Sequence, residues 1–299
     1  MSIFDLSRKK EAPVAAEPVT EPSAADAIRA LVRNEIALTP DAAAAARPDG
    51  SKIGGLPFLP ADFTWPTFTD GDGQTRPLSF FCQIDLTEAK PYDRDDLLPE
   101  RGLLAFFYEC ESFCWGFDPT DKGAARVFYF PDTVGFAPCT LPEGLYEDHI
   151  MPELALTFAA RASYPAFEEL EMHSDLCCDW EAYEAALAQL GIDAEAEMQG
   201  HKLLGYADII QGEMLTECER VTRGYGCGSP ADYQATPEAA RAQIRQHAAD
   251  WLLLLQLDTI EKDDFQWMFG DCGMLYYYIR KQDLAAGNFG SGWFSLQCY

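Results

Sequence analysis

The segment WLLLLQLD, residues 251–258, begins the most apolar and aromatic part of the chain. This part continues through DFQWMFGDCGMLYYYIR (264–280) to GWFSLQCY (292–299). Earlier in the chain, PLSFFCQID (77–85) and RGLLAFFYE (101–109) have a similar character. Short runs of aliphatic and aromatic residues bounded by glycine, proline or aspartate favour β-strands. The fold is therefore expected to depend on two similar sets of strands.

Three pairs of short blocks occur in the same order in the two halves. The pairs are SKIGGL (51–56) with HKLLGY (201–206), LSFFCQID (78–85) with WLLLLQLD (251–258), and GLLAFFY (102–108) with GMLYYYI (273–279). Several blocks repeated in one order indicate an internal duplication. The second half also contains TPEAARAQIRQHAAD (236–250), which predicts a helix capped by Thr236 with Pro237 at its first position.

These patterns predict an α+β, β-dominated fold with two pseudo-symmetric, mostly antiparallel sheet repeats and inserted helices. A single domain is expected over residues 24–299, with repeat one at 51–135, an acidic helical insert at 162–200 and repeat two at 201–299. Residues 1–23 are rich in charge, proline and alanine, a composition typical of a disordered tail.

Two helices are predicted from their caps. Ser23 is expected to cap a helix that runs to about Arg33. In the acidic insert, Asp179 is expected to cap a second helix that stops before Gly191, with an acidic face toward solvent.

The formal net charge is −27 at pH 7, which argues against nucleic acid and anionic membranes as partners. The simplest explanation of this negative charge is that it keeps the protein soluble. The alternative explanation is that the charge binds a basic protein partner. The first residues, MSIFDLSRKK, are not followed by an apolar stretch, so we expect no signal peptide, reduced cysteines and a cytoplasmic location. No apolar run approaches the roughly 20 residues that a membrane span needs.

Several motifs, taken together and in order, resemble those of the YwqG-like family, a bacterial domain of unknown function. They are SKIGGLP with WP, QID, WGFDP, GHKLLGY, LLQLD, GDCGMLY, NF and LQCY, and they cover about residues 51–299. The resemblance implies an α+β fold of β-sheet repeats in a soluble protein. It implies no established reaction and no catalytic residues.

The first candidate site residues are the matched pairs Gln83 with Asp85 and Gln256 with Asp258. Side chains two residues apart in a strand lie on the same face. If the repeats pack about a pseudo-twofold axis, the two aspartates could face each other across one cleft and act as acid and base. The alternative is that each aspartate caps the following loop and each glutamine satisfies buried backbone groups.

Lys52 and Lys202 form the other matched pair, with Ser51 and His201 beside them. The two lysines could receive an anionic ligand, with their neighbours as hydrogen-bond donors. Alternatively, they could pair with Asp85 and Asp258 and so hold loop to sheet. The salt-bridge interpretation is favoured.

The remaining candidates are Asp271, at the entrance to a predicted strand, and three tryptophans, Trp115, Trp267 and Trp293. They could line a pocket, but large aromatic side chains are more often part of the core. No C-x-x-C motif occurs, and neither a metal nor a cofactor is expected.

The favoured hypothesis is a cytoplasmic binding or interaction protein that engages a basic protein partner or a small ligand in the cleft between the repeats. The alternative is a hydrolase or transferase that uses paired carboxylates. The enzyme hypothesis requires two of Asp85, Asp258 and Asp271, or one of them with His201, to converge in one accessible pocket.

Overall fold

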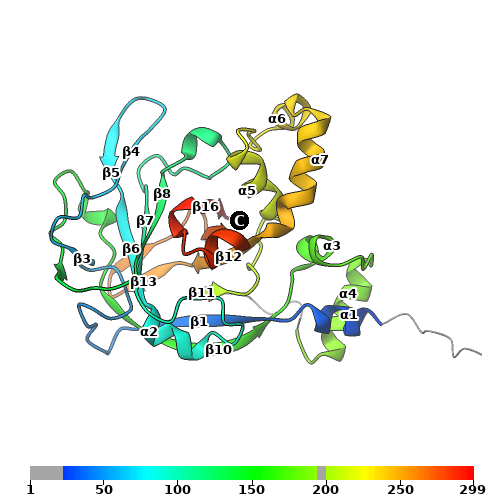
Figure 1. Ribbon diagram of the computed structural model, residues 1–299, viewed down its shortest axis with the longest axis horizontal. Helices are drawn as coiled ribbons and strands as arrows, with labels where there is room; N and C mark the ends of the chain where they lie inside the picture. Colours follow the sequence, from blue (N-terminus) through cyan, green and yellow to red (C-terminus); the bar gives the residue numbers. More distant parts are fainter. Residues whose placement is uncertain (1–22, 194–199) are drawn as a thin grey trace, which may run out of the picture.

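The computed structural model describes residues 23–193 and 200–299, and its main element is a ten-stranded antiparallel sheet (Figure 1). From edge to edge the strands are β16 (Trp293–Gln297), β15 (Met274–Arg280), β12 (Trp251–Leu257), β11 (His201–Leu204), β1 (Arg33–Asp41), β10 (Leu154–Ser163), β2 (Lys52–Ile53), β6 (Ser79–Asp85), β7 (Leu103–Tyr108) and β8 (Ala125–Phe130). The predicted α+β, β-dominated fold is confirmed. The predicted tail lies outside the described residues except for Ser23.

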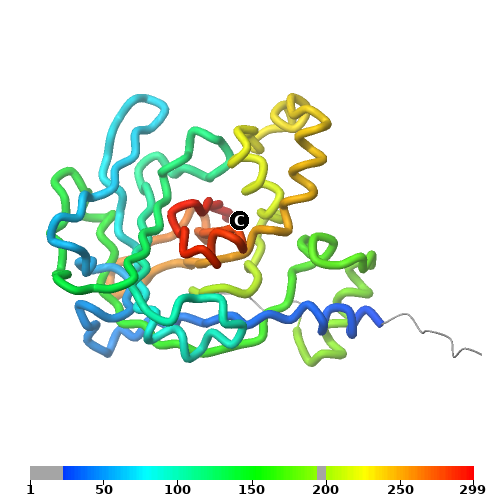
Figure 2. The backbone as a smooth tube through the Cα atoms, in the orientation of Figure 1, coloured from blue at the N-terminus to red at the C-terminus, as the bar shows by residue number. Residues whose placement is uncertain are grey.

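Strands β1 and β10 lie at the centre of this sheet, side by side over their whole length (Figure 2). Beyond β1 come β11, β12, β15 and β16, the strands of the predicted second repeat. Beyond β10 come β2, β6, β7 and β8, the strands of the predicted first repeat. Each half of the sheet thus contains one run of matched blocks. A common ancestry of the halves stays a prediction.

The sheet curves so that strands from its two halves pack against each other. The rings of Phe106 on β7 and Tyr277 on β15 have centroids 5.2 Å apart, edge to face. The Tyr277 hydroxyl donates to the carbonyl of Phe107 at 3.1 Å, and Tyr108 packs on Phe294 of β16 at 5.8 Å. One apolar core therefore joins strands that are distant in the strand order.

Strands β12 and β15 are buried on both faces, which explains why they are apolar throughout. On β15, Leu275 and Tyr277 face the main core, whereas Tyr276 and Tyr278 face a second core beneath α5 (Leu215–Thr222). A strand covered on both sides has no solvent face and so needs no alternating polar residue.

The helices cover the sheet's faces and ends. They are α1 (Ala24–Ala30), α2 (Leu86–Ala89), α3 (Leu170–His173), α4 (Trp180–Gln189), α5, α6 (Pro230–Ala235), α7 (Glu238–His247) and α8 (Lys281–Ala285). Short 3₁₀ turns are η1 (Lys90–Tyr92), η2 (Pro119–Asp121), η3 (Glu147–His149), η4 (Phe167–Glu169), η5 (Ala248–Asp250) and η6 (Phe289–Ser291). The small hairpins are β3 (Phe58–Pro60) with β9 (Phe136–Pro138), β4 (Thr67–Thr69) with β5 (Thr75–Pro77), and β13 (Ile260–Lys262) with β14 (Phe265–Trp267).

The two predicted caps are confirmed, and one predicted helix start is wrong. Ser23 Oγ accepts from the Asp26 amide at 3.2 Å, and Asp179 Oδ1 accepts from the Ala182 amide at 2.9 Å. Thr236 instead ends α6, and the α7 N-cap is Pro237, whose fixed φ suits a sharp junction between two helices. Among the described residues, every helix is too short or too polar to span a bilayer.

Candidate functional site

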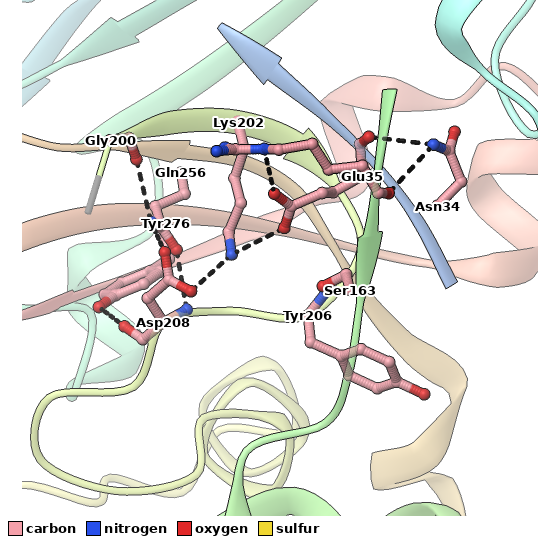
Figure 3. Close-up of polar contacts among 10 residues, drawn as sticks. Asn34, Glu35, Ser163, Gly200, Lys202, Tyr206, Asp208, Gln256 and Tyr276 are labelled. Atoms are coloured by element: carbon pink, nitrogen blue, oxygen red, sulfur yellow. Dashed lines mark hydrogen bonds and ion pairs between the residues drawn. The ribbon is translucent and has the colours of Figure 1, made fainter. Parts of the chain in front are cut away.

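Lys202 on β11 is the centre of a buried polar network (Figure 3). Its Nζ lies 2.6 Å from Asp208 Oδ1 and 3.2 Å from Glu35 Oε2 on the neighbouring strand β1. The other carboxylate oxygen of Glu35 accepts from Arg161 Nε on β10 at 3.0 Å. Two acids and two bases from separate segments therefore neutralise one another, and water is largely excluded from all of them except Arg161.

Gln256 on β12 fixes Asp208 in this network. The Asp208 amide donates to Gln256 Oε1 at 2.9 Å, and Gln256 Nε2 donates to Asp208 Oδ2 at 2.6 Å. The Tyr276 hydroxyl donates to the Asp208 carbonyl at 2.5 Å (Figure 3). Buried polar groups are stable only when paired, and these contacts satisfy both the backbone and the side chain of Asp208.

The other half of the sheet holds a simpler version of the same arrangement. Lys52 on β2 lies opposite Gln83 on β6, as Lys202 lies opposite Gln256. Gln83 Oε1 accepts from the Phe58 amide at 2.8 Å, and its Nε2 donates to the Gly50 carbonyl at 2.7 Å. Gln256 makes the corresponding bonds near Lys202, accepting from the Asp208 amide and donating to the Gly200 carbonyl. The favoured role of the glutamines, satisfying buried backbone, is confirmed.

The lysines form salt bridges as favoured, but the predicted partners are wrong. Lys52 Nζ pairs with Glu153 Oε2 at 2.8 Å, and Lys202 pairs with Glu35 and Asp208, so neither bonds to Asp85 or Asp258. Glu35 lies on the central strand β1 and Glu153 directly precedes β10, whereas Asp208 lies in the loop that follows β11. Antiparallel pairing of those strands with β2 and β11 brings their carboxylates to the lysines.

Asp85 and Asp258 lie in separate loop-holding networks. Asp85 Oδ1 caps α2 by accepting from the Thr87 amide at 2.9 Å. Asp258 accepts from the Gly200 amide at 2.8 Å and the Thr259 amide at 2.6 Å. Four strands of the sheet lie between β6 and β12. The expected cleft shared by the two aspartates is therefore wrong, because the halves are joined through β1 and β10 rather than through these strand ends.

Within the protein, Ser51 and His201 each accept a hydrogen bond from the amide of a matched aspartate, and their donation to an anionic ligand stays a prediction. Ser51 Oγ accepts from the Asp85 amide at 2.9 Å, and His201 Nδ1 accepts from the Asp258 amide at 3.1 Å. Burial lowers the pKa of His201 to about 4, against a smaller opposing effect of Asp258. The imidazole is therefore neutral near pH 7. With Nδ1 as acceptor, its proton is on Nε2.

A pocket of about 590 Å³, called here the His201 pocket, lies beside this imidazole. Its lining includes β1, Arg161, Asp258, the β13–β14 hairpin, Cys272 and Tyr299. The Nε2 of His201 has no hydrogen-bond partner among the described residues and keeps solvent access. The Arg161 side chain is 52% exposed. The pocket thus offers a neutral N–H donor and a guanidinium on a rigid wall.

The tryptophans belong to the core, as favoured. Trp267 is buried and packs on Phe81 and Phe113, and Trp115 is partly buried against the same core. Trp293 is buried under the second core and donates from Nε1 to the Gly116 carbonyl at 2.9 Å. Asp271 lies exposed in the turn before β15 and is not part of the His201 pocket lining.

Sequence reasoning missed Glu35, Asp208 and Arg161. One signal was present for Asp208, because the alignment that matches Lys52 with Lys202 places Phe58 opposite Asp208, so a charged residue stands where the first half has an aromatic one. Glu35 and Arg161 carry no such signal. They reach the site only because β1 and β10 pair across the centre of the sheet.

A match to a known family covers most of the chain. Residues 51–298 match the family described as domain of unknown function DUF1963. The chain belongs to this family. The DUF1963 match includes both lysine blocks, both glutamine strands and the His201 pocket, while α1 and β1 precede it. No curated protein matches the chain.

Proposed function

We propose that this DUF1963 protein is a binding protein that takes a small molecule with a hydrogen-bond-accepting polar group in the His201 pocket. One observation carries the proposal. His201 is held neutral with Nδ1 occupied, so its Nε2–H is a fixed donor without a protein partner at the pocket. Because Nε2 keeps solvent access, water satisfies this donor in the free protein, and an acceptor group of a ligand in the pocket would take the place of that water.

The network behind the pocket supports this role. Glu35 holds both Lys202 and Arg161, so the position of the pocket's guanidinium is coupled to the buried salt bridges. A binding site is more selective when its polar groups are fixed before the ligand arrives. Arg161 suits a carboxylate or carbonyl oxygen on the same ligand that accepts from His201.

We infer further that the chain is a tandem duplication, in keeping with the YwqG-like resemblance, and that the second copy has gained the site. The matched hydrogen bonds of Gln83 and Gln256 support a common origin. The two copies differ where Ser51 corresponds to His201 and Phe58 to Asp208. The first difference replaces a hydroxyl by an imidazole with a second ring nitrogen, and the other replaces an aromatic ring by a carboxylate. A basic protein partner stays a prediction from net charge.

The His201→Ser variant tests the function. Serine should still accept from the Asp258 amide, as Ser51 does from Asp85, but it removes the Nε2–H donor. We expect amino acids, dicarboxylates or monosaccharides that stabilise the wild-type protein in thermal-shift titrations at pH 7.5 to bind the variant about tenfold more weakly.

Ser51→Ala is the matched control, because it changes the corresponding position of the other half and leaves the His201 pocket intact. It should retain wild-type affinity. Equal affinity of the wild-type and His201→Ser proteins for every stabilising compound would rule out the proposed site.

A further inference from the structure

A second pocket lies where the two edges of the large sheet approach each other. It has a volume of about 700 Å³ and is lined by residues of β8, β16, η6 and the end of α5, and we call it the seam pocket. Strands β8 and β16 are the first and last of the ten-stranded order, and they lie near each other beside α5 (Figure 1). The pocket therefore occupies the gap where the curved sheet does not close on itself.

The charge of the seam pocket is opposite to that of the whole chain. Lys122, Arg126 and Arg280 line it, and none of its lining residues is acidic. The chain has 49 acidic residues against 22 lysines and arginines, so a lining of three cations without a carboxylate departs from the composition. This local excess of positive charge is suited to an anion.

Two of these cations are available to a ligand. Lys122 and Arg126 are exposed, and neither forms an ion pair with any described residue. The acidic residues nearest in sequence to Lys122 accept hydrogen bonds from backbone amides of their own loop. Asp118 accepts from the Thr120 amide at 2.8 Å, and Asp121 accepts from the Gly116 amide at 3.0 Å.

The third cation is held rigidly. Arg280 donates from Nη2 to Glu219 at 2.7 Å and to Thr222 Oγ1 at 2.9 Å, and its guanidinium lies 4.2 Å from the Trp251 ring centroid. Glu219 also pairs with Arg223 at 2.6 Å, so this one carboxylate is shared by two arginines. The wall of the seam pocket keeps a net positive charge.

The rest of the lining allows close approach to the backbone. Gly224, Gly290 and Gly292 contribute no side chains, and Ser291 lies between the last two. Glycine-rich turns beside basic side chains are a common way of presenting backbone N–H groups to oxyanions. The outer edges of β8 and β16 add main-chain groups that are not used by a neighbouring strand of the sheet.

We propose that the seam pocket binds a small molecule that carries a multiply charged oxyanion, either a phosphate ester or a polycarboxylate. Lys122 and Arg126 contact the anion directly, and Arg280 provides a fixed positive wall. A long polyanion is repelled by the net charge of −27, but a small one responds mainly to charges within about 8 Å at physiological ionic strength. This site is independent of the His201 pocket.

The test uses the full chain and two double variants at pH 7.5, with ionic strength held constant by sodium chloride. Pyrophosphate and citrate are titrated by calorimetry. We expect at least one of them to bind the wild-type protein, and Lys122→Ala with Arg126→Ala to weaken that binding by about tenfold or more. Arg94→Ala with Arg101→Ala removes the same charge from exposed residues outside the seam pocket and should leave affinity unchanged.

Each result decides the proposal. Binding of pyrophosphate alone supports a phosphate ligand, and binding of citrate alone supports a polycarboxylate. Failure of both anions to bind the wild-type protein overturns it, as does equal weakening in the two double variants. His201→Ser should bind the anions as the wild-type protein does, which separates this site from the His201 pocket.

Discussion

Replacing Lys202 by methionine is expected to lower the free energy of unfolding by about 3–5 kcal/mol. The substitution keeps most of the apolar stem but removes the charge that Glu35 and Asp208 share. Both carboxylates are about 10% exposed, so water cannot replace the lost ammonium. Arg161 still compensates Glu35, which leaves Asp208 as the main source of the cost. Urea denaturation at pH 7 measures the loss.

Lys52→Met is the matched control in the other half of the sheet. Lys52 is equally buried, but its partner Glu153 has a side chain 42% exposed and can be hydrated when the lysine is gone. We expect a loss of about 1 kcal/mol, in the range of exposed ion pairs. Adding Asp208→Asn to Lys202→Met should restore part of the stability. Equal losses for the two lysines would contradict this account of the network.

The stability of the protein is expected to fall at acidic pH partly through His201. Its folded pKa of about 4 lies below the ordinary value of 6.5. Below pH 6.5 the imidazole of the unfolded chain is therefore mostly protonated, whereas the imidazole of the folded protein stays neutral down to about pH 4. Lowering the pH between these values favours the unfolded state. Linkage gives about 2 kcal/mol between pH 7 and pH 4.5 from this one group.

The difference between the wild-type and His201→Ser proteins isolates this contribution. Serine removes the titration together with a packing effect that does not depend on pH. The stability of the wild-type protein relative to the variant should therefore decrease by about 2 kcal/mol from pH 7 to pH 4.5 in urea denaturation. His247→Ser, at a side chain 40% exposed on α7, controls for the loss of a histidine that is not buried. A difference that stays constant with pH would show that His201 titrates normally.

The strands on either side of the central pair β1 and β10 could be predicted because their sequences carry strong local patterns. β6, β7, β12 and β15 are nearly continuous apolar runs, which burial on two faces explains. The central strands β1 and β10 were not predicted. β1 contains Glu35 and Pro40, and β10 has exposed residues over much of its length, so neither shows the apolar run of a central strand.

Some residues of the candidate site could likewise be predicted from the sequence, whereas their contacts could not. Lys202 and Gln256 were found because each stands in a block that recurs, and His201 was found as a neighbour of one of them. Asp85 and Asp258 were also found, but their predicted meeting was wrong. Which residues recur is a property of the chain, whereas which of them meet depends on how the halves are joined.

Local pattern alone was enough to establish the β-rich class, the outer strands, two helix caps and the matched lysine and glutamine positions. Propensity, periodicity and capping act between residues that are near in sequence, so the amino-acid order reveals them directly. The pairing of β1 with β10, the salt bridges of Lys202 and the two pockets were decided only by the folded chain. The strand pairing, the two pockets and the bond between Glu35 and Lys202 join segments more than 100 residues apart, and their energies depend on burial and charge that exist only after the strands have assembled.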